Sequence, residues 1–160
     1  GEAMNVEVYN KFLAKTGLLA AAQTLTNKTL TAPSFGNGAS VETGTAATTD
    51  ATVTTVWSKA LADNTVYDLD ITLVGRRTNP AVAGTAEYAI FRRRVAYSRD
   101  NAGAATIIGT AETIATDRES TGGYDITIDA STNDVRVRAT GANSHNIRWN
   151  CTVRIHAATT

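Results

Sequence analysis

Hydrophobic and polar residues alternate along much of this chain with the period of two that is typical of β-strands. The clearest run is residues 147–156, in which polar residues take one face. The other face carries Ile147, Trp149, Cys151, Val153 and Ile155. Successive side chains of a strand point to opposite faces, so this run predicts a half-buried β-strand. Because one strand cannot bury its apolar face alone, other strands must pack with it.

The same pattern predicts about six further strands, separated by turns at the spacing typical of a sandwich or barrel. In one of them, residues 67–73, the odd-numbered positions are all large and apolar. Residues 87–98 change phase within the run, which indicates a bulge or a strand covered on both faces. No long helices alternate with these strands. We therefore predict an all-β fold, an antiparallel and jelly-roll-like β-sandwich, over residues 51–160.

The first fifty residues follow a different pattern. Residues 1–22 contain a short stretch of helical spacing, residues 5–16, and then a small apolar patch. Residues 23–50 are rich in Thr, Ala, Gly and Ser and lack periodicity, which predicts an extended arm or linker. So long an arm needs a surface to lie on, most simply another subunit. The residues expected at this attachment or subunit interface are Val6, Tyr9, Phe12, Leu13, Leu25, Leu30, Pro33 and Phe35.

Composition and charge narrow the class of protein. A chain of 160 residues suits one domain with a core, preceded by an arm. The formal net charge of +0 offers no general attraction to nucleic acid or to an anionic membrane, and neither is expected as a partner. The single cysteine, Cys151, is predicted to be a buried thiol. With no apolar run long enough to span a bilayer and no signal-peptide pattern, we expect a soluble protein.

Arg92, Arg93 and Arg94 form the densest group of charges. They have two interpretations: a charged interface for an anion, a sugar or a partner subunit, or cross-strand pairing with outward-facing aspartates. Pairing is favoured, because acidic residues alternate along the neighbouring predicted strands. The aspartates expected as partners are Asp68, Asp70, Asp125 and Asp129.

A second group of basic residues could form a stripe that binds nucleic acid. It comprises Arg136, Arg138, Arg148 and Arg154. The aromatic residues of the same strands are predicted on the opposite face, whereas nucleic-acid binding needs both on one face. We therefore predict no nucleic-acid binding by this stripe.

The aromatic residues have two interpretations, as surfaces on which sugars stack or as parts of the core. The residues concerned are Trp57, Tyr67, Tyr88, Tyr97 and Trp149. Most of them fall on positions predicted to face the core, so core packing is favoured. A glycan ligand stays an open alternative.

Catalytic and metal-binding patterns are weak. His145 is adjacent to Ser144, a spacing that rarely gives triad geometry, and no nucleophile, zinc-protease or dithiol motif occurs. Asp117, Glu119 and Asp125 flank a glycine turn but lack the spacing of a calcium loop. We predict no catalytic residues, no metal site and no cofactor.

Two stretches resemble surface proteins of phage virions. Residues 24–33, which read TLTNKTLTAP, are similar to a segment of tail fibres and other displayed phage proteins. A set of shorter motifs resembles a β-domain of the same kinds of protein. These motifs are VGRR at 74–77, FRR at 91–93, VRATG at 137–141 and the final strand with Arg148 and Trp149.

This resemblance implies a virion protein, assembled in the cytoplasm of the bacterial host, that is usually a homotrimer and has no catalytic activity. Its partners would be further copies of itself and the major capsid protein or a tail protein. The absence of a repetitive shaft favours a capsid decoration or head-fibre protein, attached through its N-terminal region. The alternative is a receptor- or glycan-binding module of a tail fibre. Exposed aromatic clusters would favour the module, and aromatic residues wholly in the core would favour decoration.

Overall fold

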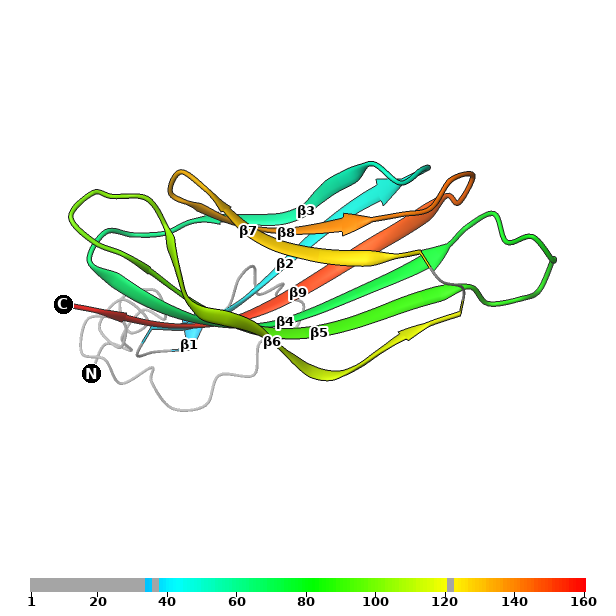
Figure 1. The fold of residues 1–160 in the computed structure, drawn as a ribbon. Coiled ribbons are helices and arrows are strands. Elements are labelled where there is room, and N and C mark those ends of the chain that lie inside the picture. The colour runs from blue at the N-terminus through cyan, green and yellow to red at the C-terminus, as the bar shows by residue number, and fades with distance from the viewer. Residues whose placement is uncertain (1–33, 36–37, 121–122) are drawn as a thin grey trace, which may run out of the picture. The chain divides into compact units, whose positions relative to one another are not determined.

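The chain from residue 34 onward is an assembly of antiparallel strands (Figure 1). The structure is a computed structural model that describes residues 34–35, 38–120 and 123–160. The strands of these residues are β1 (Ser34–Phe35), β2 (Ala39–Thr48), β3 (Val53–Ala60), β4 (Thr65–Arg77), β5 (Tyr88–Arg99), β6 (Thr106–Glu119), β7 (Asp125–Ser131), β8 (Asp134–Thr140) and β9 (Ile147–Thr159). The prediction of an all-β, antiparallel fold is confirmed.

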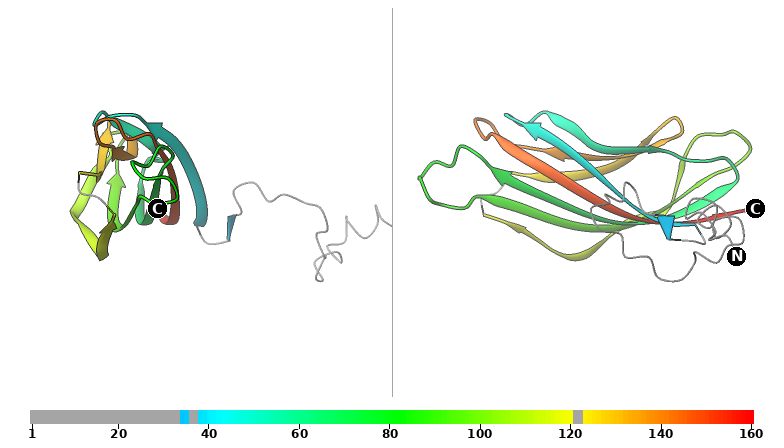
Figure 2. Two further views of the ribbon diagram at one scale, coloured as in Figure 1. Left: turned by 90° about the vertical axis from the view of Figure 1, so that its right-hand side faces the viewer. Right: turned by 180° about the vertical axis from the view of Figure 1, so that it is seen from behind.

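The strands form two sheets that face each other. The larger sheet has the order β1-β2-β9-β4-β5-β6, and the smaller has the order β3-β8-β7. Figure 2 shows the same two layers from a second side and from behind. The final strand, β9, lies inside the larger sheet between β2 and β4. A jelly-roll topology is not confirmed by this order of strands.

The core lies between the two sheets and is built from the alternating positions of their strands. In β9, residues 147–155 alternate strictly between buried and exposed, as the sequence predicted. Trp149, which is wholly buried, donates a hydrogen bond of 2.9 Å from Nε1 to Oγ1 of Thr48. Its ring lies over Gly75, where an added Cβ would be 2.3 Å from the indole. Only glycine leaves room for Trp149 at this position.

Cys151 belongs to the same buried row of β9 and is 1% exposed. Burial raises the pKa of its thiol to about 12. The prediction of a buried, free cysteine is confirmed.

The phase predicted for β4 is confirmed, whereas the phase change predicted within β5 does not occur, because its buried positions are all odd-numbered. Odd-numbered residues 67–73 of β4 are buried, and Phe91, Val95 and Tyr97 of β5 are buried while Tyr88 is exposed. The irregularity expected here lies in the pairing of β5 with its neighbour β6. Three register shifts match residues 89–98 of β5 to residues 106–119 of β6, so β6 carries the extra residues. In β3 the alternation is interrupted, because a register shift after Thr55 buries both Val56 and Trp57.

Strand β2 lies within the stretch that the sequence analysis assigned to an extended arm. It pairs with β9 along its whole length, from Ala39 opposite His156 to Thr48 opposite Ile147. The sequence pattern did not predict this strand, because its small residues give no alternation of apolar and polar positions. They also allow close packing on the other sheet, because a Cβ at Gly44 would be 2.2 Å from the carbonyl oxygen of Val56.

The predicted N-terminal helix lies outside the described residues, and so does most of the predicted attachment interface. The interface residues outside them are Val6, Tyr9, Phe12, Leu13, Leu25, Leu30 and Pro33. Phe35 lies in β1, opposite Ala39 of β2. In the part of the chain that the structure covers, no helix has the length and apolarity needed to cross a membrane.

Candidate functional site: the outer face of the larger sheet

The outer face is the surface of β2, β9, β4, β5 and β6 that points away from the smaller sheet. Its side chains alternate with the buried positions of the same strands, and the register aligns them in rows across the sheet. One row consists of Arg154 of β9, Asp70 of β4, Arg94 of β5 and Glu112 of β6. The next row is Thr152, Thr72, Arg92 and Ala115.

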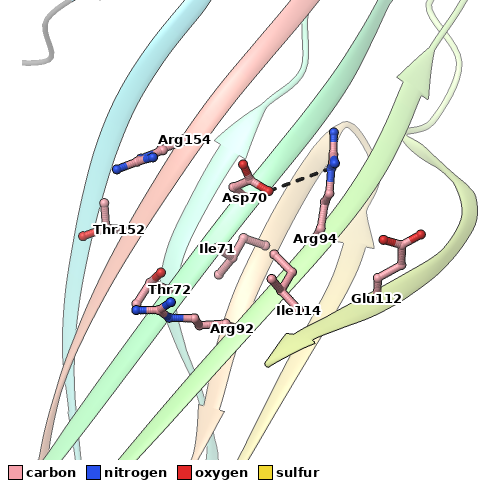
Figure 3. Close-up of a pocket in the computed structure, with 9 residues that line it drawn as sticks. All are labelled: Asp70, Ile71, Thr72, Arg92, Arg94, Glu112, Ile114, Thr152 and Arg154. Carbon is pink, nitrogen blue, oxygen red and sulfur yellow. Dashed lines mark ion pairs between the residues drawn. The ribbon is translucent and has the colours of Figure 1, made fainter. Parts of the chain in front are cut away.

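These two rows line a hollow of about 670 Å³, drawn in Figure 3. Its polar lining comes from Asp70, Thr72, Arg92, Arg94, Glu112, Thr152 and Arg154. The extra residues of β6 bring Ile114 to this surface as well, and its side chain is 52% exposed. Donors, acceptors and the apolar residues Ile71 and Ile114 therefore line the same hollow, and they come from four strands.

The charges at one end of the outer face are paired. Arg94 donates from Nε to Oδ1 of Asp68 at 3.0 Å and also bonds to that carboxylate through Nη2. Asp70 lies 3.9 Å from Nε of the same guanidinium (Figure 3). The hydrogen bond from Arg94 is the main reason that the pKa of Asp68 is below its usual value. Because one guanidinium serves two carboxylates, Arg94 is held in a fixed orientation.

The structure separates the three consecutive arginines that the sequence analysis grouped. Arg93 points inward, where it donates to both carboxylate oxygens of Asp117 at 2.6 and 2.7 Å and lies 5.8 Å from the ring centre of Phe91. That pair lowers the pKa of Asp117. Arg94 pairs outward with Asp68, as the pairing interpretation expects, and Arg92 has no ion pair among the described residues. Only Arg92 and Arg94 therefore line the hollow.

The other end of the outer face carries arginines that lack acidic partners within the described residues. We call the set Arg76, Arg92, Arg118 and Arg148 the arginine end. Arg76 of β4 is directly opposite Arg148 of β9, so two like charges face each other. Arg92 and Arg118 line a second, smaller hollow of about 130 Å³, to which Ile90 also contributes. Sequence reasoning missed this set because its members come from four strands, and only the register brings them to one end.

The basic stripe considered from the sequence does not form. Arg136 and Arg138 belong to β8 of the smaller sheet, whereas Arg148 and Arg154 belong to β9 of the larger one. Asp129 of β7 pairs with both β8 arginines, at 2.9 Å from Arg136 and 2.6 Å from Arg138. These two arginines therefore share one carboxylate within their own sheet.

Four of the five aromatic residues considered as sugar platforms are in the core. They are Trp57, Tyr67, Tyr97 and Trp149. The fifth, Tyr88 of β5, is 42% exposed and lies opposite Arg76 of β4. One exposed aromatic ring is thus present at the arginine end.

Three of the residues considered for catalysis and metal binding, His145, Ser144 and Asp117, have structural partners. Nδ1 of His145 is 2.7 Å from the hydroxyl of the buried Tyr124. The backbone carbonyl of Ser144 accepts hydrogen bonds from Arg77 and Asn79. Asp117 is engaged with Arg93, as described above. Within residues 34–160, leaving aside the four undescribed positions, no three His, Cys, Asp or Glu side chains are grouped closely enough to hold a metal ion.

Comparisons with known proteins give a likeness in fold alone. No protein-family model and no curated protein matches the chain. Among solved structures, the tailspike protein of Acinetobacter baumannii phage AM24 is similar over 72% of this chain and 26% of its own, with 11% identity and a TM-score of 0.45. The tailspike of Acinetobacter phage vB_ApiP_P1 is similar over 88% of this chain and 25% of its own, with 14% identity and a TM-score of 0.36.

A third similar structure is the tailspike gp49 of the A. baumannii bacteriophage Fri1, a capsular polysaccharide depolymerase. The similar region covers 74% of this chain and 18% of the Fri1 protein, with 14% identity and a TM-score of 0.35. The chain thus spans about a quarter or less of the length of each of these three tailspikes. All three are tailspike proteins of phages. At these TM-scores the likeness supports no conclusion about function.

One expectation of the sequence analysis is corrected by this comparison. The resemblance to phage surface proteins was taken to imply that the chain has no catalytic activity. The Fri1 tailspike is a phage surface protein and, as a capsular polysaccharide depolymerase, an enzyme. The step from that resemblance to an absence of catalysis is therefore wrong.

Proposed function

We propose that this chain is a surface domain of a phage tail protein and that its outer face binds a glycan of the host cell. The observation that carries the proposal is the hollow of about 670 Å³ on the outer face. Binding sites for small molecules are concave and place a few polar groups on rigid elements. The hollow meets that description, because β4, β5, β6 and β9 all contribute to its lining.

The chemistry of the lining suits a saccharide. Sugar hydroxyls both donate and accept hydrogen bonds, so they need donors and acceptors at fixed positions. Here the acceptors are the carboxylates of Asp70 and Glu112, and the donors are guanidinium groups such as Arg154. The hydroxyls of Thr72 and Thr152 serve in both roles. Ile114 adds an exposed apolar surface beside them.

The assignment to a phage particle rests on the sequence, and the tail is proposed because a glycan-binding face must reach the host cell. Residues 24–33 are similar to a segment of tail fibres and other displayed phage proteins. The domain would then stand at the surface of the particle, where a glycan-binding face can reach the host cell. In this arrangement the protein would act as a homo-oligomer, with its N-terminal region joined to other tail proteins.

A capsid decoration or head-fibre protein is the second candidate. The burial of Trp57, Tyr67, Tyr97 and Trp149 favours it, because a surface rich in exposed aromatic residues is missing from the described part of the chain. A homotrimer attached to the major capsid protein would then display the same β-domain on the head.

Immunogold labelling of intact phage particles separates the two candidates. An antibody against residues 38–160 should label the tail if the proposal is correct. Label spread over the head would support decoration and contradict the tail assignment. Particles that stay unlabelled, although the same antibody detects the purified chain, would overturn both candidates.

A further inference from the structure

The arginine end is arranged unlike any other group of charges in the described residues. Elsewhere several cationic side chains have carboxylate partners: Arg77 with Glu87, Arg93 with Asp117, Arg94 with Asp68, and Arg136 with Asp129. Arg99 and Arg154 form no ion pair with the described residues, but Arg99 donates to backbone carbonyls and Arg154 lies opposite Asp70. At the arginine end, the described residues give Arg76, Arg92, Arg118 and Arg148 no such partner. Four arginines without a carboxylate partner among the described residues are therefore gathered at one end of the outer face.

The register makes this omission costly for the isolated domain. Like charges directly opposite each other on neighbouring antiparallel strands are destabilising. Arg76 and Arg148 occupy such positions, and both side chains are exposed. The outer-face positions around them are Asn150, Val74, Ile90 and Tyr88, so no described carboxylate lies in these rows. An acidic ligand would remove the repulsion.

The spacing of the arginines suits an extended ligand that crosses the strands. Arg148, Arg76 and Arg118 lie on β9, β4 and β6, and adjacent strands are about 4.8 Å apart. The arginine end therefore extends about 14 Å across the sheet. It adjoins the larger hollow through Arg92, which lines both. A chain molecule can thus occupy the hollow and reach the arginine end together.

We infer that the glycan bound by the outer face is an acidic polysaccharide, whose carboxylates are held by Arg76, Arg92, Arg118 and Arg148. This inference rests on the proposed glycan-binding function and names the class of ligand. The planar guanidinium matches a carboxylate through two parallel hydrogen bonds. Tyr88, exposed next to Arg76, offers an aromatic surface for the apolar face of a sugar ring.

A nucleic acid is the competing polyanion, and two observations weigh against it. The chain has a formal net charge of +0, so no overall field attracts a long, uniformly charged polymer. The row next to the arginine end carries the carboxylates of Asp70 and Glu112, which would repel successive phosphates. An acidic polysaccharide can place neutral sugars there and its carboxylates over the arginines.

Binding to immobilised bacterial polysaccharides tests the inference. The probes are acidic polysaccharides that contain uronic acids, their carboxyl-reduced forms, neutral polysaccharides and a single-stranded DNA oligonucleotide. We expect binding to an acidic polysaccharide and its loss on carboxyl reduction. R76Q and R148Q should each weaken that binding about tenfold, the loss expected for one hydrogen bond to a charged group. R136Q, which changes a paired arginine of the smaller sheet, should leave the affinity unchanged.

The outcomes separate the inference from the proposed function. Equal binding of acidic and carboxyl-reduced forms, or binding that R76Q and R148Q do not weaken, would overturn the inference and leave glycan binding standing. Binding of the oligonucleotide more tightly than any polysaccharide would overturn the inference in favour of nucleic acid. Failure to bind any polysaccharide would overturn both. Thermal unfolding of each variant confirms that a loss of binding is not a loss of folding.

Discussion

The two faces of β4 differ in burial and in charge. On the inner face, odd-numbered residues 67–73 are almost wholly buried and pack in the core. On the outer face of the same strand, Asp68, Asp70, Thr72 and Arg76 remain accessible and carry charge or hydroxyl groups. The inner face follows from burial of apolar area alone, whereas the outer face contains an arrangement, Arg76 opposite Arg148, that burial does not explain.

The difference teaches where a functional surface can be found in a β-domain without a catalytic motif. Residues whose neighbours neutralise them, such as Arg94 beside Asp68, need no ligand. Residues whose neighbours repel them are stabilised by a ligand of opposite charge. Among the described residues, such side chains lie at the arginine end. Substitutions on the inner face should therefore lower the free energy of unfolding. Substitutions at the arginine end should instead weaken binding and leave the fold stable.

The largest effect is expected from truncating the inner face. Leu69→Ala should lower the free energy of unfolding by about 2–5 kcal/mol, because it removes apolar contacts and leaves a cavity at a fully buried site. Thr72→Ala, on the outer face of the same strand, should change it by about 0.5 kcal/mol or less. Denaturant unfolding of both variants measures the contrast, and equal losses would contradict the division of the faces.

The next effect concerns Gly75, also on the inner face. Gly75→Ala should cost about 1–3 kcal/mol, because the new Cβ would lie 2.3 Å from the Trp149 ring and the core must shift to admit it. A matched control is Val74→Ala at the adjacent, 38% exposed position, for which little change is expected. Thermal unfolding and the NMR signal of the Trp149 indole N–H follow both variants. An unchanged indole signal in Gly75→Ala would show that the ring does not fill this place.

A smaller effect is expected from acid. In the folded state the pKa values of Asp68 and Asp117 lie below the usual value of 3.8, mainly because Arg94 and Arg93 donate to them. A lowered folded pKa contributes stability that is present above the unfolded pKa and is lost as the pH falls through the folded one. Stability should therefore decrease below about pH 4. Asp117→Asn should flatten this dependence, and an unaltered pH profile would mean that the pair with Arg93 is absent in solution.

The smallest effect has the opposite sign. Arg76→Gln should leave the free energy of unfolding unchanged or raise it by a few tenths of a kcal/mol, because it removes the charge opposite Arg148. Arg94→Gln should lower the unfolding midpoint, because it leaves Asp68 without its hydrogen bonds. Parallel unfolding curves at low salt measure the pair. A loss of stability in Arg76→Gln would contradict the claim that this arginine has no structural partner.

Local sequence patterns predicted the strands whose two faces differ most. The alternation in residues 147–156 and 67–73 predicted the buried rows of β9 and β4, because one face of each strand is apolar throughout. Strand β2 was missed, since Gly44 and the alanines around it pack closely without large apolar side chains. Burial by small residues leaves little trace in a hydropathy pattern.

The candidate site was harder to predict than the fold. Three consecutive arginines drew attention to residues 92–94, yet alternation sends Arg93 inward to Asp117. Arg76 and Arg148 are far apart in the sequence, and only the register of β4 with β9 sets them opposite each other. A charged residue without an oppositely charged neighbour can be recognised only when the register of the adjacent strands is known.

The most direct test of the central claim is an NMR titration that follows the arginine side-chain Nε–Hε signals. The titrant is an oligosaccharide cut from the acidic polysaccharide that the domain binds. The account predicts that the signals of Arg76, Arg92, Arg118 and Arg148 shift together, while those of Arg136 and Arg138, paired with Asp129, stay in place. Shifts confined to the smaller sheet, with the arginine end unmoved, would contradict it.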